Sequence, residues 1–208
     1  MAGVKRRYDG AARRAQAERV RAALIETARD MLLNDGYAAL TIPKLAKAGG
    51  VSAESVYKRF AGKPALVRAV VDQALRGIGP VAAETRSDAL GVDDLQELLR
   101  GWGRLSAEVA PRVAPILLLV HAAAAHDLQL ANLARELDDN RRARMAGNAR
   151  RLADAGHLPP GLSVAQATDI LWTYSSPQIY DLLVVRSGWN LDRYATFLAA
   201  GLAAHFST

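Results

Sequence analysis

Apolar residues recur every three or four positions along most of this chain, and this spacing constrains the fold more than any other feature. Val20, Leu24, Ala28 and Met31 illustrate it, because residues three and four apart share one face of an α-helix. No stretch alternates apolar and polar residues over several positions, as a half-buried strand would. The sequence therefore predicts an all-α fold of nine or ten helices without an internal repeat.

Composition excludes several classes of protein. The chain has 208 residues, of which 50% are apolar and 23% charged, so it is long enough for one or two domains with a packed core. It has no cysteine, which excludes disulfides, a thiol nucleophile and cysteine-ligated metals. The longest nearly apolar run, residues 113–125, contains 13 residues, against the roughly 18 that span a bilayer. Residues 1–30 lack the apolar region of a secretory signal, so we expect a cytoplasmic protein without membrane segments.

Capping residues, glycines and prolines divide the chain into predicted helices. The first runs from about residue 17 to 34 and is ended by Gly36. Thr41 caps a short helix over 42–48, and Ser52 caps another over 53–60. A connecting helix follows over 63–79, and residues 1–16 lack apolar periodicity, which indicates a mobile basic arm. We therefore expect an arm over 1–16, a first domain over 17–62, the connecting helix over 63–79 and a second domain over 80–208.

The second domain should contain longer helices. Residues 93–109 form one candidate, and a separate helix punctuated by Pro111 and Pro115 should run to residue 125. Further helices are predicted over 127–155, 163–185 and 191–206. Pro177 falls within the 163–185 helix, where it should cause a kink and free the carbonyl of Thr173.

The basic excess is confined to the first third of the chain. Residues 1–65 hold 13 Lys and Arg against 6 Asp and Glu, whereas residues 66–208 hold 14 against 15. An excess of positive charge on one small module is the expected footprint of a polyanion such as nucleic acid, although a solvated basic face would look the same.

Residues 41–63 have the pattern of a helix-turn-helix motif. Two short helices flank the pair Gly49-Gly50, which allows them to cross closely. Val56 and Phe60 point toward the core, so the opposite face of the second helix displays Ala53, Glu54, Ser55 and Lys58. Small and polar side chains suit a helix that enters the major groove.

The segment resembles the DNA-binding domain of the TetR/AcrR family of transcriptional regulators. The resemblance covers residues 17–75 and rests on Gly36, Tyr37, Thr41, Leu45, Ala46, Gly50, Val51, Ser52, Tyr57, Phe60 and Lys63. It implies that Thr41, Tyr57, Arg59 and Lys63 contact phosphates, and that Ser52, Glu54 and Ser55 lie at the groove edge, with Lys58 along the same helix. The chain departs from the family pattern at Gly49, Ala53 and Glu54. Glu54 either accepts from a cytosine or only favours the positive helix end, and the 1–16 arm either reaches a minor groove or is a disordered tail.

Family resemblance also assigns the second domain to effector binding and dimerisation. The helices over 163–185 and 191–206 are apolar on more than one side, which favours a homodimer formed by these last two helices. The candidate lining of an effector cavity is Trp102, His121, Trp172, Tyr174, Gln178 and Tyr180, although each residue could equally be part of the core or the interface.

These observations favour a regulator that binds a palindromic DNA operator as a homodimer and is released by a small apolar or aromatic molecule. Such a regulator would be a repressor. The alternatives are a transcriptional activator, and a regulator whose second domain senses a protein partner instead of a small molecule. An enzyme is disfavoured because a Gly-rich phosphate loop and the GxSxG and HExxH signatures are missing. No cofactor or metal is expected, since His121 and His126 are five residues apart and do not share a helix face.

Overall fold

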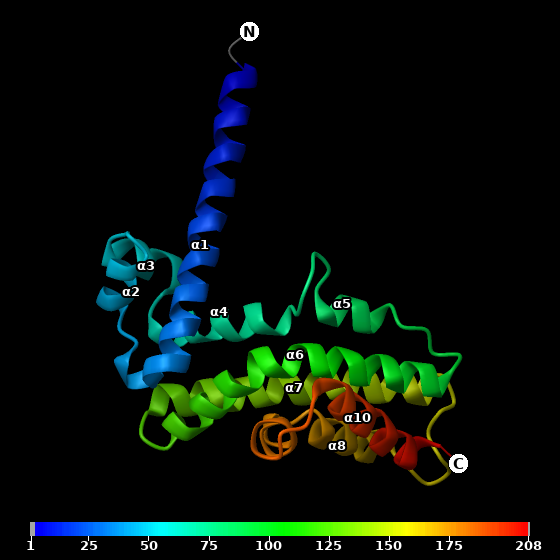
Figure 1. Cartoon of the computed structure of the whole chain (residues 1–208). Helices are drawn as coiled ribbons and strands as arrows, with labels where there is room; N and C mark the ends of the chain where they lie inside the picture. Colours follow the sequence, from blue (N-terminus) through cyan, green and yellow to red (C-terminus); the bar gives the residue numbers. More distant parts are fainter. Residues whose placement is uncertain (1–2, 208) are drawn as a thin grey trace. The chain divides into compact units, whose positions relative to one another are not determined.

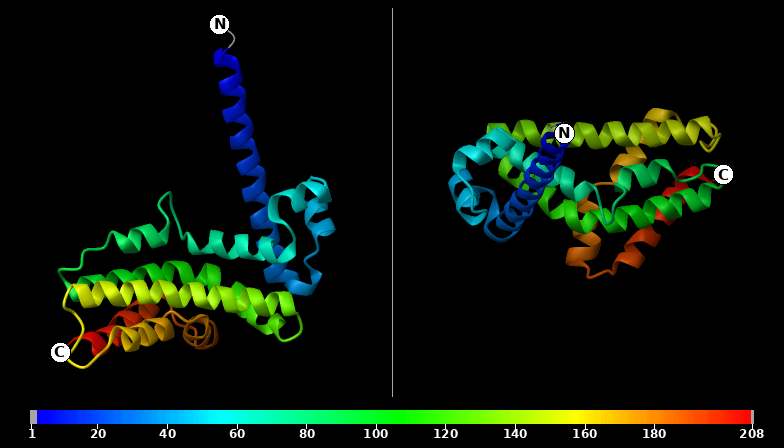
Figure 2. Two further views of the ribbon diagram at one scale, coloured as in Figure 1. Left: turned by 180° about the vertical axis from the view of Figure 1, so that it is seen from behind. Right: turned by 90° about the horizontal axis from the view of Figure 1, so that it is seen from above.

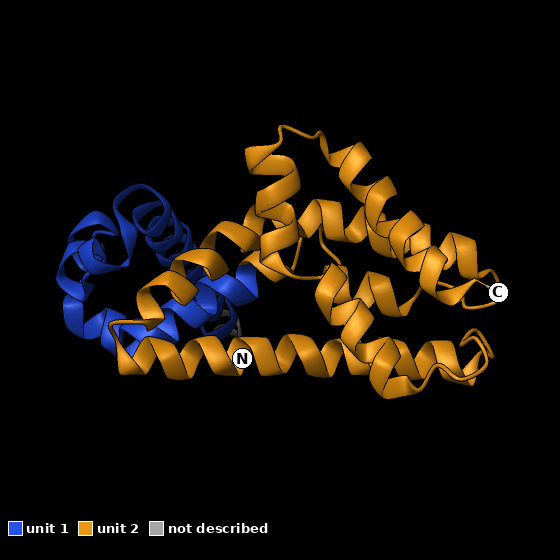
Figure 3. Cartoon of the chain, turned by 90° about the horizontal axis from the view of Figure 1, so that it is seen from below, with its two compact units in different colours: residues 1–73 blue, residues 74–208 orange. Residues whose placement is uncertain are grey.

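The computed structural model describes residues 3–207, with side chains from residue 10 onward, and all regular structure in this range is helical (Figure 1). The chain forms two compact units, Met1–Gln73 and Ala74–Thr208 (Figure 3). The predicted all-α class is thus confirmed, and the structure places the change of unit inside the helix that was expected to connect the two domains.

The first unit contains α1 (Gly3–Ala39), α2 (Ile42–Ala48), α3 (Ala53–Phe60) and the greater part of α4 (Lys63–Leu75). Local signals determine where these helices end. Thr41 accepts a hydrogen bond from the Lys44 amide at the start of α2, and Gly36 interrupts α1 with a positive φ of 80°, which suits glycine. Buried side chains from all four helices form the core, among them Leu24, Leu45, Val56, Phe60 and Leu66.

Helix α1 differs from its predicted extent. We expected residues 1–16 to form a mobile arm, but the backbone is helical from Gly3 onward. The run of Ala, Arg and Gln over residues 11–17 explains the difference, because these residues have high helix propensity without any apolar periodicity. Their side chains are exposed, and α1 extends well past α2 and α3 (Figures 1 and 2).

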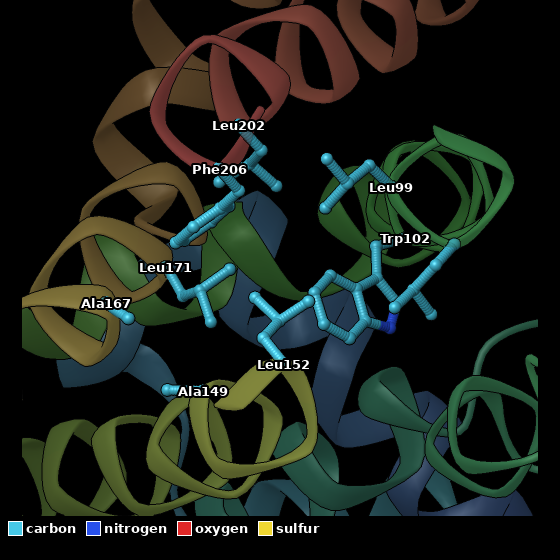
Figure 4. Packing of buried hydrophobic residues seen from close by; sticks show 9 residues of the cluster. Leu99, Trp102, Ala149, Leu152, Ala167, Leu171, Leu202 and Phe206 are labelled. Atoms are coloured by element: carbon cyan, nitrogen blue, oxygen red, sulfur yellow. The ribbon is translucent and has the colours of Figure 1, made fainter. Parts of the chain in front are cut away.

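The second unit packs long helices against each other. It contains α5 (Ala83–Asp88), α6 (Leu95–Ala124), α7 (Leu128–Asp154), α8 (Val164–Tyr174), α9 (Pro177–Tyr180), the π-helical segment η1 (Asp181–Arg186) and α10 (Leu191–Phe206). Helix α6 packs on α7 and α10, and α7 packs on α8. The buried side chains of this core come from α6, α7, α8 and α10 (Figure 4) and comprise Leu98, Leu99, Trp102, Ala149, Leu152, Ala167, Leu171, Leu202 and Phe206.

The two helices predicted over residues 93–125 are in fact the single helix α6. Pro111 and Pro115 lie inside it, although each proline removes one backbone hydrogen bond. The buried residues Val113, Ala114 and Ile116 around the prolines provide packing that offsets this loss. By length and composition α6 could also cross a membrane, as the core helices of soluble proteins often could.

Pro177 begins a new helix instead of kinking a continuous one, which corrects the prediction for residues 163–185. Helix α8 stops at Tyr174, and α9 begins at Pro177. The carbonyl of Thr173 is not free, because it accepts a hydrogen bond from the Ser176 amide at 3.0 Å. The following π-helical turn of η1 and the short helix α5 were also missed by the sequence analysis.

Candidate nucleic-acid interface

The turn between α2 and α3 is compact because two glycines occupy it. A Cβ on Gly49 would lie 2.5 Å from Leu24 Cδ2 of α1, and Gly50 has a φ of 64°. The turn is closed by the Val51 amide, which donates to the Ala46 carbonyl at 3.0 Å. The absence of a Cβ at Gly49, one of the departures from the family pattern, therefore lets this turn pack closely on α1.

Helix α3 is capped by its own serines. Ser52 Oγ accepts from the Ser55 amide at 3.1 Å, and the Ser52 hydroxyl donates to Ser55 Oγ at 3.0 Å. At the other end, Ala61 adopts a left-handed conformation with a φ of 51°. The eight residues between these two signals form a short helix whose orientation is fixed by the buried side chains of Val56 and Phe60.

The exposed face of α3 carries Glu54, Tyr57 and Lys58. Tyr57 is 55% exposed, which is unusual for a large aromatic side chain without a partner. Arg59 is half-buried, and its guanidinium donates to the Ser55 carbonyl at 2.9 Å. Ala53 is half-buried at the helix start. The structure thus presents one anionic, one aromatic and one cationic side chain together, while Arg59 is turned back onto its own helix.

Two further predicted residues flank this face. Thr41 is half-buried, and its hydroxyl oxygen is already used by the α2 cap at 3.3 Å from the Lys44 amide. The Lys63 ammonium group lies 3.6 Å from the ring centre of Tyr37 at the end of α1. This cation–π contact, which the sequence analysis did not predict, positions Lys63 at the start of α4.

Arg21, Lys44 and Lys47 also lie in this unit and were not among the predicted site residues. Lys44 and Lys47 are exposed on α2, on the side opposite the buried Leu45. Arg21 of α1 lies over the Phe60 ring, with 5.4 Å between Cζ and the ring centre. The helical spacing of Lys44 and Lys47 relative to Leu45 is a sequence signal that would have identified the two lysines as exposed.

Comparison with known proteins shows which family the helix-turn-helix region is similar to. Residues 24–70 match the family model described as bacterial regulatory proteins, tetR family, and this range contains the turn and the exposed face of α3. This segment is therefore similar to the DNA-binding domain of the TetR family. None of the curated protein sequences matches the chain significantly.

Solved structures share the fold over most of the chain. A TetR-family regulator from Rhodococcus sp. has a TM-score of 0.67 at 15% identity, covering 90% of this chain and 98% of that one. NalD, the secondary repressor of the MexAB-OprM multidrug efflux pump in Pseudomonas aeruginosa, has a TM-score of 0.66 at 20% identity, with coverages of 91% and 96%. The SmeT–triclosan complex has a TM-score of 0.68 at 18% identity, with coverages of 89% and 90%. At these identities the likeness shows a shared fold.

The predicted effector residues lie in several different environments. Trp102 is part of the core shown in Figure 4. Tyr180 is buried in a second cluster, where its ring meets Tyr194 edge-on at 5.7 Å, and burial raises the pKa of both phenols, that of Tyr194 to about 12. Tyr174 is half-buried beside Phe197, and Gln178 is exposed.

The remaining two predicted residues take part in one polar cluster between α6, α7 and α8. His121 Nε2 lies 3.2 Å from Asp138 Oδ2, and Asp138 Oδ1 lies 3.3 Å from Arg141 Nη2. The Arg141 guanidinium stacks on the Trp172 ring at 4.8 Å and donates to the Trp172 carbonyl at 2.6 Å. Burial lowers the pKa of Arg141, and its Nε and the indole N–H of Trp172 are buried without a hydrogen-bond partner among the described residues.

A hollow in the second unit lies elsewhere. It has a volume of about 250 Å³ and is lined by Leu95, His157, Phe206 and their neighbours. None of the six predicted effector residues lines this hollow. The hollow and the polar cluster around Arg141 are therefore separate features of the second unit.

Proposed function

We propose that this chain regulates transcription by binding a palindromic DNA operator as a homodimer. The observation that carries the proposal is the exposed face of α3, where Glu54, Tyr57 and Lys58 project from a helix held rigidly by its buried side. A helix of this size fits the major groove, which is about 12 Å wide. Thr41, Lys63, Ser52 and Ser55 surround this face, and phosphate contacts at its edge would set the register of the domain on the duplex.

Exposed apolar side chains near the C-terminus support the homodimer. Leu182 and Val185 of η1 are 52% and 60% exposed, and Phe197 of α10 is 38% exposed. A second copy of the chain would cover these side chains through the predicted interface of the last helices. A dimer with two-fold symmetry places two α3 helices on two half-sites, which should lie about 34–36 Å apart or a multiple of that distance.

The second unit is proposed to bind a small effector that releases the DNA. Among the proteins of similar fold, SmeT has been solved as a complex with triclosan. In this chain, the buried Trp172 N–H and Arg141 Nε lack acceptors among the described residues, and unpaired buried donors are costly unless a ligand or water completes them. Release requires that the effector bind more tightly to a conformer in which the two α3 helices have the wrong separation.

Selection of duplexes from a random pool tests the DNA-binding proposal. We expect enriched sequences with an inverted repeat, bound by two chains of a cytoplasmic dimer. Enrichment of no sequence at low ionic strength would contradict it. Mass spectrometry of the untreated protein tests the effector proposal, because a co-purifying small molecule is expected. A purified protein that releases DNA only when a protein partner is added would instead establish the alternative function of the second unit.

A further inference from the structure

The long N-terminal part of α1 has no visible structural role in the first unit. Side chains of residues 11–19 are exposed, and the helix continues past α2 and α3 in both views (Figures 1 and 2). In proteins, most helical stability comes from tertiary packing of one face, and the side chains of residues 11–19 have no such packing. An isolated projecting helix therefore points to a partner that covers it.

The charge of this segment indicates what the partner is. Residues 3–16 contain one acidic residue, Asp9, and five basic ones, Lys5, Arg6, Arg7, Arg13 and Arg14. Of these, Arg13 and Arg14 lie among the described side chains and are exposed. A concentration of positive charge on one exposed helix is complementary to a polyanion.

The part of α1 that directly follows this segment contacts the proposed DNA-binding helix. Arg21 lies over the ring of Phe60, the last residue of α3, at 5.4 Å. The chain N-terminal to Arg21 therefore leaves the domain at one end of α3. At 1.5 Å per residue, residues 3–19 form a rod of roughly 25 Å, which is long enough to follow the backbone bordering a groove that α3 occupies.

The helical conformation decides how the segment can meet a duplex. An α-helix with its side chains is about 10–12 Å wide, whereas the minor groove is about 6 Å wide. Entry into a minor groove, which we considered for a flexible arm, is therefore incompatible with the helix. Arginine and lysine side chains along a helix that lies outside the groove can still neutralise phosphates.

We propose that residues 3–16 of α1 form a second DNA-contacting element, which binds the phosphate backbone beside each half-site without reading bases. The inference rests on the proposed function of α3, and it extends the footprint of each protomer beyond the helix-turn-helix motif. The duplex stabilises the projecting helix by neutralising its charge, so the helix should be more ordered in the complex than in the free protein.

The test compares the full chain with a variant lacking residues 1–16 on the same selected duplex. Each neutralised phosphate contributes about 0.9 to the slope of log K against log salt, so removal of both arms of the dimer should lower the slope by roughly 2 or more. Hydroxyl-radical footprints should shorten at both outer edges. The double variant Arg13→Gln, Arg14→Gln should show part of the same loss. The matched control Arg135→Gln, Arg150→Gln removes the same charge from exposed positions of α7 and should leave the slope unchanged.

The outcomes separate this inference from the proposed function. If the full chain binds the duplex and truncation leaves both slope and footprint unchanged, the inference is wrong while the function of α3 stands. If truncation shifts the base preference at positions inside the half-site, the segment reads bases and the inference is also wrong. If the α7 control lowers the slope as much as the α1 variant, the effect is one of net charge and the proposed element is refuted. Absence of any binding by the full chain contradicts the function itself.

Discussion

The two units of the molecule differ in how they hold their charged side chains. In the first unit, Lys44, Lys47 and Lys58 are exposed. In the second unit, arginines are joined to carboxylates in ion pairs, as Arg144 is to Asp88 at 2.7 Å and Arg142 to Asp169 at 2.6 Å. Uncompensated positive charge on a small domain costs stability through self-repulsion. A basic first unit and a charge-paired second unit are what the proposed function expects, with a polyanion bound by the first and a structural or sensing role for the second.

The largest expected effect comes from removing a core side chain from one unit only. This substitution tests whether the two units have separate roles. Phe60 is 4% exposed in the first unit, and Phe60→Ala should cost about 3–5 kcal/mol of unfolding free energy there. DNA binding should be lost in anisotropy titrations while sedimentation still shows the dimer. The matched change in the second unit is Leu152→Ala, at a fully buried position. A Phe60→Ala protein that is monomeric but still binds DNA would contradict the division of roles.

A glycine at the start of the second unit provides the next test. Gly77 has a φ of 73°, and a Cβ there would collide with Oε1 of Glu108. Gly77→Ala should therefore lower the free energy of unfolding by about 1–2 kcal/mol, measured by urea denaturation. Gly91→Ala is the control, because a Cβ at Gly91 meets open space, and it should be nearly neutral. Equal effects of the two substitutions would mean that the loop after α4 is not held as the structure shows.

Substitution of Lys63, the cation at the start of α4, tests the proposed contact of the first unit with a single phosphate. Lys63→Ala should weaken binding about fivefold on every duplex and lower the salt slope by about 1 for each protomer. Lys63→Arg should retain both values, because the charge and the stacking on Tyr37 are kept. A sequence-dependent loss in the alanine variant would instead assign Lys63 to base recognition.

The smallest expected effect concerns the carboxylate of Glu108, which joins separate segments of the second unit through hydrogen bonds. Glu108 accepts hydrogen bonds from Arg86, which holds the pKa of Glu108 below its ordinary value, and from the Ile78 amide at 2.5 Å. A lowered pKa in the folded state means that this contribution is present at neutral pH and is lost as the pH falls through the folded-state pKa. Glu108→Gln should lower Tm by about 2 °C at pH 7, and the difference should shrink on acidification. Glu97→Gln, at an exposed ion pair with Arg104, should change Tm less.

The predicted helices, set beside the structure, show which parts of the fold follow from local sequence signals. Thr41, Gly50 and Ser52 act within a few residues of their own position, so the bounds predicted for α2 and α3 agree with the structure. Pro111 is a local signal for a helix end, but packing along α6 outweighs it. Residues 3–16 lack an apolar pattern, and their helix follows from propensity alone.

The candidate site was predictable to a similar extent. Helical spacing identified the exposed positions Glu54 and Lys58 but also placed Ala53 and Ser55 on this face, where they are half-buried. The role of Tyr57, which is exposed, was implied by the family resemblance. Helical spacing did not identify the hydrogen bond that turns Arg59 back onto Ser55 or the stacking of Lys63 on Tyr37, because these depend on side-chain conformation. In the second unit, the cluster of His121, Asp138 and Arg141 joins different helices, and contacts of that kind require the tertiary structure.

One measurement tests the central claim most directly. The full chain and the double variant Tyr57→Ala, Lys58→Ala are titrated against the selected duplex over a series of salt concentrations. Both substitutions are at exposed positions of α3, so the variant should remain folded by circular dichroism while its affinity falls at least tenfold and its salt slope becomes shallower. Equal affinity and equal slope for the two proteins would show that the exposed face of α3 is not where this protein meets DNA.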